Sequence, residues 1–147
     1  MGGEVLSTMR RNDLDWLLTG FVNRVAGIDH ALLVSSEGLL LASTPEVSPA
    51  LGDQLAAVTS GVISLSRGAA NFLRAGQLNH TLLEMEGALV LLMSISNGSF
   101  LTIVASPTAD LGLVGFEMAR LTEQLNHTFT PVDRVPQLNM GRHQKIR

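Results

Sequence analysis

The stretch DHALLVSSEGLLLAS, from Asp29 to Ser43, contains two short apolar runs separated by a turn. Residues 30–35 and 39–43 have the length of strands, and Ser36-Glu37-Gly38 supplies the small, polar and glycine residues that hairpin turns require. Successive residues of a strand point to opposite faces of a sheet, and both faces of these runs carry apolar side chains. The pattern therefore predicts a β-hairpin in a sheet that is covered on both faces.

The segment before the hairpin predicts a helix. Asp13 is a candidate N-cap, and Ala26-Gly27 is a typical helix end. The apolar residues between them recur at helical spacing and form one stripe: Leu14, Leu17, Leu18, Phe21, Val22 and Val25. Trp16 lies nearly opposite this stripe, where it either packs against a loop or anchors a partner. Residues 1–12 are predicted to be a flexible N-terminus.

Ser48-Pro49 predicts the start of a second helix, because serine is a good N-cap and proline is favoured at the first helical position. The helix is expected to reach about Leu73. Its predicted core stripe is Leu51, Leu55, Val58, Val62, Leu65, Ala69 and Leu73. A second stripe has only very small side chains: Ala57, Gly61, Ser64 and Gly68.

Glycine inside a helix costs about 1 kcal/mol relative to alanine, so two glycines on one line indicate that something approaches this backbone closely. Either a bulky neighbour from the same chain fills the space, or the helix pairs with its copy in a two-fold dimer. We favour the dimer. The outer face of the same helix presents Ile63, Arg67 and Arg74, which is either a partner-contact strip or a solvated surface.

The segment after Gly76 predicts three strands, at 77–85, 88–95 and 99–105, joined by turns at Glu86-Gly87 and Asn97-Gly98. The first of these strands is the most polar, as expected at a sheet edge or a subunit seam. Thr108 or Asp110 then begins a last helix, which runs through Asn126. Its predicted core stripe is Leu111, Val114, Met118, Leu121 and Leu125. The order is helix, two strands, helix, three strands, helix, which is an α+β domain.

Charge is distributed unevenly along the chain. Residues 12–130 contain 4 basic and 11 acidic residues, whereas residues 131–147 contain 4 basic residues and 1 acidic residue. An acidic body argues against nucleic-acid binding by the domain, and the basic segment 131–147 is predicted to be a disordered tail. No apolar run is long enough to span a membrane, and no secretory signal is visible, so we predict a cytoplasmic protein.

The sequence shows no constellation that would support catalysis. It contains no cysteine, its single lysine is Lys145, and its four histidines are scattered, so thiol chemistry, a P-loop and a histidine-rich metal site are not expected. Glu84 and Glu86 share one face of a strand, but solvated edge carboxylates explain them better than a paired acid and base. We predict no catalytic residue, no metal site and no cofactor.

Together these elements resemble the Roadblock/LC7 family over residues 13–127. The resemblance is carried by LDWLLTGFVNRVAGIDHALLVSSEGLLLAS (residues 14–43), by the small-faced middle helix, and by ALVLLMSISNG (residues 88–98). The opening LDWLL is similar to the actinobacterial branch, whose members are typically encoded beside a sensor-kinase-like protein and a small Ras-like GTPase.

The resemblance implies a profilin-like domain over residues 13–130. Its five-stranded antiparallel sheet would carry the middle helix on one face and the two terminal helices on the other. Family members dimerise through the middle helix and the strand after it. The homodimer interface implied here comprises Ala57, Gly61, Ser64, Gly68, Leu78, His80 and Leu82.

The implied function is a non-catalytic platform that binds a small Ras-like GTPase and either stimulates its hydrolysis or acts as a scaffold. The expected contact residues are Ile63, Arg67 and Arg74, with a sensor-kinase-like protein as a further partner and recruitment to the membrane periphery through partners. The alternative is a small-molecule-sensing or adaptor domain that works with a sensor kinase. A sensor would need an apolar pocket with polar groups to orient its ligand.

Overall fold

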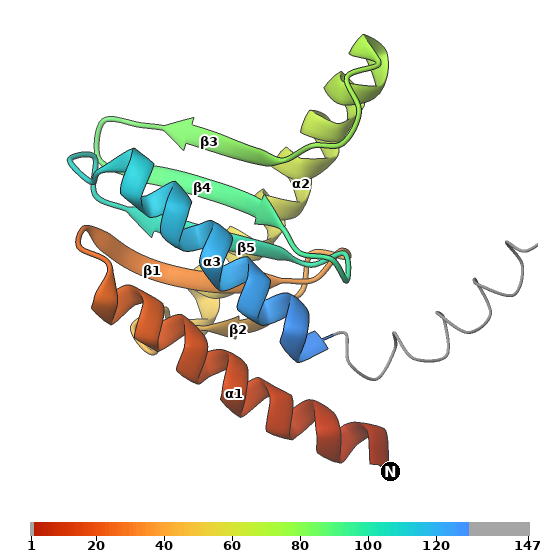
Figure 1. The fold of residues 1–147 in the computed structure, drawn as a ribbon, viewed down its shortest axis with the longest axis vertical. Helices are drawn as coiled ribbons and strands as arrows, with labels where there is room; N and C mark the ends of the chain where they lie inside the picture. The colour runs from red at the N-terminus through yellow and green to blue at the C-terminus, as the bar shows by residue number, and fades with distance from the viewer. Residues whose placement is uncertain (1, 130–147) are drawn as a thin grey trace, which may run out of the picture.

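A computed structural model describes the backbone of residues 2–129 and the side chains of residues 13–127. The elements follow the predicted order, helix, two strands, helix, three strands, helix (Figure 1). Their bounds are α1 (Gly2–Arg24), β1 (Ile28–Val34), β2 (Leu40–Ser43), α2 (Pro49–Leu73), β3 (His80–Glu84), β4 (Leu89–Ser94), β5 (Phe100–Ala105) and α3 (Leu111–Phe129). The predicted tail, residues 131–147, lies outside the described residues.

The five strands form one antiparallel sheet in the order β2-β1-β5-β4-β3. The hairpin β1–β2 joins the meander β3–β4–β5 through the pairing of β1 with β5, in which Leu32 lies opposite Thr102. This pairing places β5 at the centre of the sheet and β3 at one edge (Figure 1).

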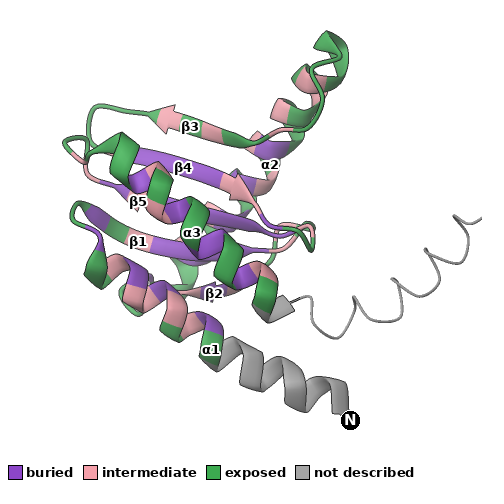
Figure 2. Ribbon diagram, in the orientation of Figure 1, coloured by how far each residue is buried: buried purple, intermediate pink, exposed green. Residues whose placement is uncertain are grey.

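Helices cover both faces of the sheet, as the hairpin predicts: α1 and α3 lie on one face and α2 lies on the other (Figure 1). Alternate residues of β1 pack into the cores on the two faces of the sheet. Ala31 and Leu33 belong to the core beneath α1 and α3, whereas Leu32 and Val34 pack with residues of α2. Figure 2 shows the resulting continuous burial of the central strands.

The hairpin turn is held by both backbone and side-chain hydrogen bonds. The Ser35 N–H donates to the Leu39 carbonyl at 2.8 Å, and the Ser35 hydroxyl oxygen accepts from the N–H groups of Glu37 and Leu39 at 3.2 and 3.1 Å. Gly38 has φ +88°, a left-handed conformation that strongly favours glycine. The predicted role of this glycine in the turn is therefore confirmed.

The helix α1 begins at Gly2, so Asp13 lies inside it and the predicted N-cap is wrong. The helix also includes residues 2–12, for which the sequence predicts a flexible N-terminus. Residues 4–12 contain no proline or glycine, so no helix breaker separates them from the apolar stripe. That stripe faces the core, with Leu14, Leu18, Phe21 and Val25 buried, while Trp16 is 75% exposed.

The helix α2 begins as predicted, with the Ser48 hydroxyl oxygen accepting from the Leu51 N–H at 3.2 Å and Pro49 at the first turn. Its predicted core stripe is only partly correct, because Leu51, Leu55 and Val62 pack half-buried against the core but are not its most buried residues. The buried residues are Gly52, Ala56, Thr59 and Ile63, and three members of the predicted stripe, Val58, Leu65 and Leu73, are 50%, 79% and 75% exposed.

The reason for this rotation of α2 is its close approach to the sheet. A Cβ atom added to Gly52 would lie 2.7 Å from the Leu40 Cδ2 atom, closer than real Cβ contacts. Small residues line the fully buried face where the N-terminal half of α2 crosses the sheet, and Leu51 and Leu55 pack half-buried beside them.

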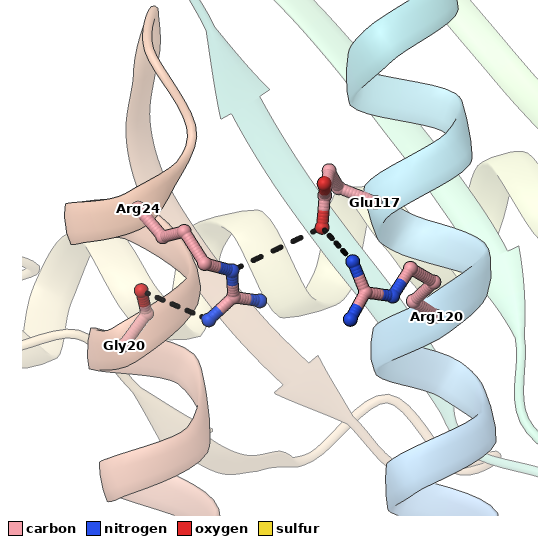
Figure 3. Close-up of polar contacts among 4 residues, drawn as sticks. All are labelled: Gly20, Arg24, Glu117 and Arg120. Carbon is pink, nitrogen blue, oxygen red and sulfur yellow. Dashed lines mark hydrogen bonds and ion pairs between the residues drawn. The ribbon is translucent and has the colours of Figure 1, made fainter.

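An ion-pair cluster links the two helices of the opposite layer (Figure 3). One oxygen of Glu117 lies 3.6 Å from an Arg120 nitrogen on α3 and 3.9 Å from the Arg24 Nε atom on α1. Arg24 also donates to the Gly20 carbonyl at 3.5 Å. Since both arginines are largely exposed, we expect this cluster to fix the relative position of α1 and α3 rather than to supply much stability.

The hydroxyl groups of Thr59 on α2 and Thr102 on β5 form a buried hydrogen bond of 2.9 Å between the helix and the sheet. Replacing Thr59 alone with valine should reduce the free energy of unfolding by about 1–3 kcal/mol, because the Thr102 hydroxyl loses this partner. The double variant Thr59→Val, Thr102→Val should recover most of this loss, since valine has nearly the same shape. Urea denaturation of the four proteins tests this, and strictly additive losses would contradict it.

Candidate protein-interaction surface

The outward face of α2 carries an exposed apolar line along its C-terminal part, from Val58 to Phe72. Val58, Leu65 and Phe72 occupy every seventh position and are 50%, 79% and 90% exposed. Gly61 and Gly68 lie between them, so the spacing alternates between three and four residues, as in helices that pack against another helix. We call these five residues the α2 seam.

The glycines of the α2 seam face open space. A Cβ atom added to Gly61 or Gly68 would have no heavy atom within 4 Å. Within the described residues, no bulky neighbour of the same chain fills this space, so that interpretation of the small stripe is wrong. Ala57 and Ser64, the other predicted interface residues on α2, are exposed beside the seam.

The predicted interface residues of β3 lie at the free edge of the sheet. Among residues 2–129, β3 pairs only with β4, so its other edge has no strand partner. His80 and Leu82 are exposed and lie opposite Met93 and Leu91, whose side chains belong to the layer of α1 and α3. Leu78 is half-buried against the core beneath α2, so it has a packing role in the single chain as well.

The three predicted contact residues have different environments. Ile63 is 3% exposed and packs with Val90, Leu92 and Phe100, so its prediction as a partner contact is wrong. The same rotation of α2 that exposes Leu65 turns Ile63 towards the sheet.

Arg67 and Arg74 remain accessible, and each is held in place. The Arg67 guanidinium lies over the Phe100 ring, 5.1 Å from its centroid, which is a cation–π geometry. Arg74 ends α2 in the left-handed conformation, with φ 51°. Its N–H donates to the Asn71 carbonyl at 3.2 Å. The sequence between Ile28 and Ala119 contains no other lysine or arginine, so these two residues carry the basic charge of this part of the chain.

The hollow beside Arg67 does not provide the enclosed pocket that a small-molecule sensor needs. It has a volume of about 590 Å³, and only Ile95 among its lining residues is buried, whereas Arg67, Asn71 and Gln77 are exposed. Within the described part of the chain, no group of three or more histidine, aspartate or glutamate residues is placed to hold a metal ion. None of the helices in residues 2–129 combines the length and apolar character needed to cross a membrane.

The fold and the exposed α2 seam define an α+β domain with a surface suited to protein association. The Roadblock/LC7 domain family model matches residues 14–105, and the chain belongs to this family. A Roadblock/LC7 domain from Streptomyces avermitilis is 32% identical, with 76% of this chain and 92% of that chain covered and a TM-score of 0.72. No curated protein matches the sequence.

Two more distant structures share the fold. MglB from Myxococcus xanthus is 16% identical, with 80% of this chain and 88% of that chain covered and a TM-score of 0.74. The gliding protein MglB from Thermus thermophilus is 21% identical, with 81% and 90% covered and a TM-score of 0.70. The predicted α+β architecture and family are thus confirmed, whereas the actinobacterial branch stays a prediction.

The left-handed conformation of Arg74 should carry a measurable strain. For a residue with a Cβ atom, this conformation costs about 1–2 kcal/mol, and glycine avoids the cost. We expect Arg74→Gly to raise the free energy of unfolding by about 1 kcal/mol. Arg74→Ala is the matched control, because it removes the same side chain but keeps the strain. Equal stabilities of the two variants in urea denaturation would contradict the assignment.

Proposed function

We propose that this protein is a non-catalytic platform that dimerises through the α2 seam and the β3 edge and binds a small Ras-like GTPase. The observation that carries the proposal is the α2 seam itself, with large exposed apolar residues alternating with glycines that nothing covers. Contiguous exposed apolar surface of this kind marks association sites on soluble proteins. Family membership supports the same conclusion, since Roadblock/LC7 proteins typically dimerise and act on small GTPases.

The alternation of large and small residues suggests a register for the dimer. A two-fold axis perpendicular to α2 at the level of Ile63 would pair Leu65 with Gly61 of the second copy. It would also pair Val58 with Gly68. Each bulky residue would then enter the space above a glycine, which permits two helices to approach closely. The free edge of β3 would lie beside the same axis and pair with its counterpart, which would remove an exposed strand edge.

This register predicts that exchanging the large and small residues at positions 65 and 61 restores the association that a single substitution abolishes. Gly61→Leu alone should dissociate the dimer, because leucine would meet Leu65 of the second copy. Gly61→Leu combined with Leu65→Gly exchanges the large and small residues and should restore association. Analytical ultracentrifugation over a range of concentrations measures both. A double variant that dissociates as fully as Gly61→Leu, while remaining folded by circular dichroism, would contradict the register.

Replacing Gly61 with a large, charged residue tests the dimer interface itself. Gly61→Arg should reduce the mass in solution from two protomers to one, because it buries a guanidinium without a partner. Asn23→Arg is the control, since it adds the same side chain at an exposed site on α1, on the opposite face of the sheet. An unchanged mass for Gly61→Arg would exclude an interface at the α2 seam.

For the GTPase, we propose Arg67 and Arg74 as contact residues. Both are exposed, both lie on or at the end of α2, and the contact with Phe100 holds the Arg67 side chain in a defined position. A guanidinium held in this way is available for carboxylate or phosphate groups of a partner. We further propose that the protein acts in the cytoplasm and reaches membranes only through its partners.

Affinity capture from the native cell extract, with a GTP analogue or with GDP, tests the GTPase proposal. We expect mass spectrometry to identify a small Ras-like GTPase, and the purified GTPase to bind the Arg67→Glu, Arg74→Glu double variant at least tenfold more weakly. Asn23→Glu, at an exposed site on α1 on the opposite face of the sheet, is the control. Capture of a sensor-kinase-like protein alone would instead favour the adaptor alternative.

A further inference from the structure

A second apolar feature lies on the opposite face of the sheet from α2. It is a groove of about 380 Å³ between α3 and the edge strand β3. Its lining residues are His80, Leu82, Leu91, Met93, Leu111, Gly112, Gly115, Phe116 and Met118. Figure 1 shows α3 lying across β4, with β3 beyond it at the sheet edge. Gly112 and Gly115 are two of the wall residues, and a Cβ atom on Gly115 would have no neighbour within 4 Å.

One end of this groove is acidic. Glu84, at the end of β3, lies two residues beyond Leu82 and is exposed on the same side of the strand. Asp110 precedes α3 at the same end of the groove, where its carboxylate accepts from the Leu113 N–H at 3.2 Å. Glu86 follows in the turn between β3 and β4. The groove thus combines an apolar floor with carboxylates at the N-terminal end of α3.

We propose that the C-terminal segment of this same chain, residues 136–147, binds in the groove. Apolar residues alternate with polar ones in Pro136-Gln137-Leu138-Asn139-Met140, so an extended segment places Leu138 and Met140 on one side. Pro136 is compatible with such an extended segment. The basic residues Arg142, Lys145 and Arg147 follow, and they complement the acidic end of the groove.

The lengths of the elements agree with this arrangement. Residues 130–135 connect α3 to this segment, and the part of α3 from Phe116 to Phe129 is about 20 Å long at 1.5 Å per residue. An extended chain from Phe129 to Leu138 spans up to about 30 Å. Leu138 therefore reaches the level of Phe116 after the chain reverses direction, and the basic residues beyond it reach the level of Asp110 and Glu84.

Two arguments favour this occupant over a separate peptide. A tethered segment has a high effective concentration at a site that its linker reaches. The charges also match: residues 131–147 have 4 basic residues and 1 acidic residue, whereas residues 13–127 have 4 basic and 11 acidic residues. The groove shares His80 and Leu82 with the proposed β3 interface, so the tests below use Phe116, Met93 and Met118, which line the groove but lie outside that interface.

The absence of cysteine from the full chain permits a direct crosslinking test. The double variant Phe116→Cys, Leu138→Cys should form an intramolecular disulfide under mild oxidation at least tenfold faster than Leu113→Cys, Leu138→Cys. Leu113 and Phe116 are exposed on the same helix at 43% and 61%, but only Phe116 lines the groove. Rates are measured by alkylation and mass spectrometry, with products separated by mass. Equal rates would overturn the proposal, and a product of twofold mass would assign the groove to the segment of a second copy.

The methionines provide a second test without cysteines. In the full-length protein with ¹³C-labelled methionine methyl groups, Leu138→Asp should shift the resonances of Met93 and Met118, which line the groove. The resonance of Met85 is the internal control, because this residue is 49% exposed and lies outside the groove lining. Unchanged Met93 and Met118 resonances, or an equal shift of all three, would overturn the proposal.

Discussion

The close contact between α2 and the sheet at Gly52 and Leu40 is the constraint on which the rest of the structure depends. A Cβ atom at Gly52 would lie 2.7 Å from the Leu40 Cδ2 atom, so a larger residue there would require the Leu40 side chain to move. The small residues Ala56 and Thr59 continue this contact along the buried face. With that face against the sheet, Ile63 is buried in the core, whereas Leu65 and Phe72 are exposed.

The exposed α2 seam is therefore a consequence of packing within the chain. Leu65 is 79% exposed and Phe72 is 90% exposed because the sheet accepts the other face of the same helix. A helix with two small-residue faces can approach its own sheet on one side and a second helix on the other. The glycines at positions 61 and 68 each cost about 1 kcal/mol relative to alanine, and a helix partner that packs onto them offsets this cost.

The two faces of the sheet present different surfaces for interaction. The α2 face offers a helix with an apolar seam, with the Arg67 guanidinium placed over Phe100 and Arg74 at the end of the helix. The other face offers a groove between α3 and β3 that ends at Glu84 and Asp110. The groove borders β3, whose outer edge has no strand partner among residues 2–129. A contact made at this edge is thus adjacent to the groove.

Local signals in the sequence by themselves determined the order of the elements, the turns and the start of α2. Gly38 and Gly98 occupy positive φ values of 88° and 92° in the predicted turns, and Ser48 caps α2. The spacing of Gly61 and Gly68 also identified a helix face that nothing in the described chain covers. These features depend on residues close together in the chain, so they are readable from sequence.

The rotation of α2 about its axis was decided only by the tertiary structure. Both candidate faces of this helix have helical periodicity, and that periodicity does not say which face meets the sheet. The contact of Gly52 with Leu40, on a strand of the preceding hairpin, selects the buried face. Ile63 therefore enters the core and Leu65 becomes exposed, the reverse of the prediction. The physical reason is that the distance between α2 and the sheet depends on contacts between side chains that lie far apart in the sequence.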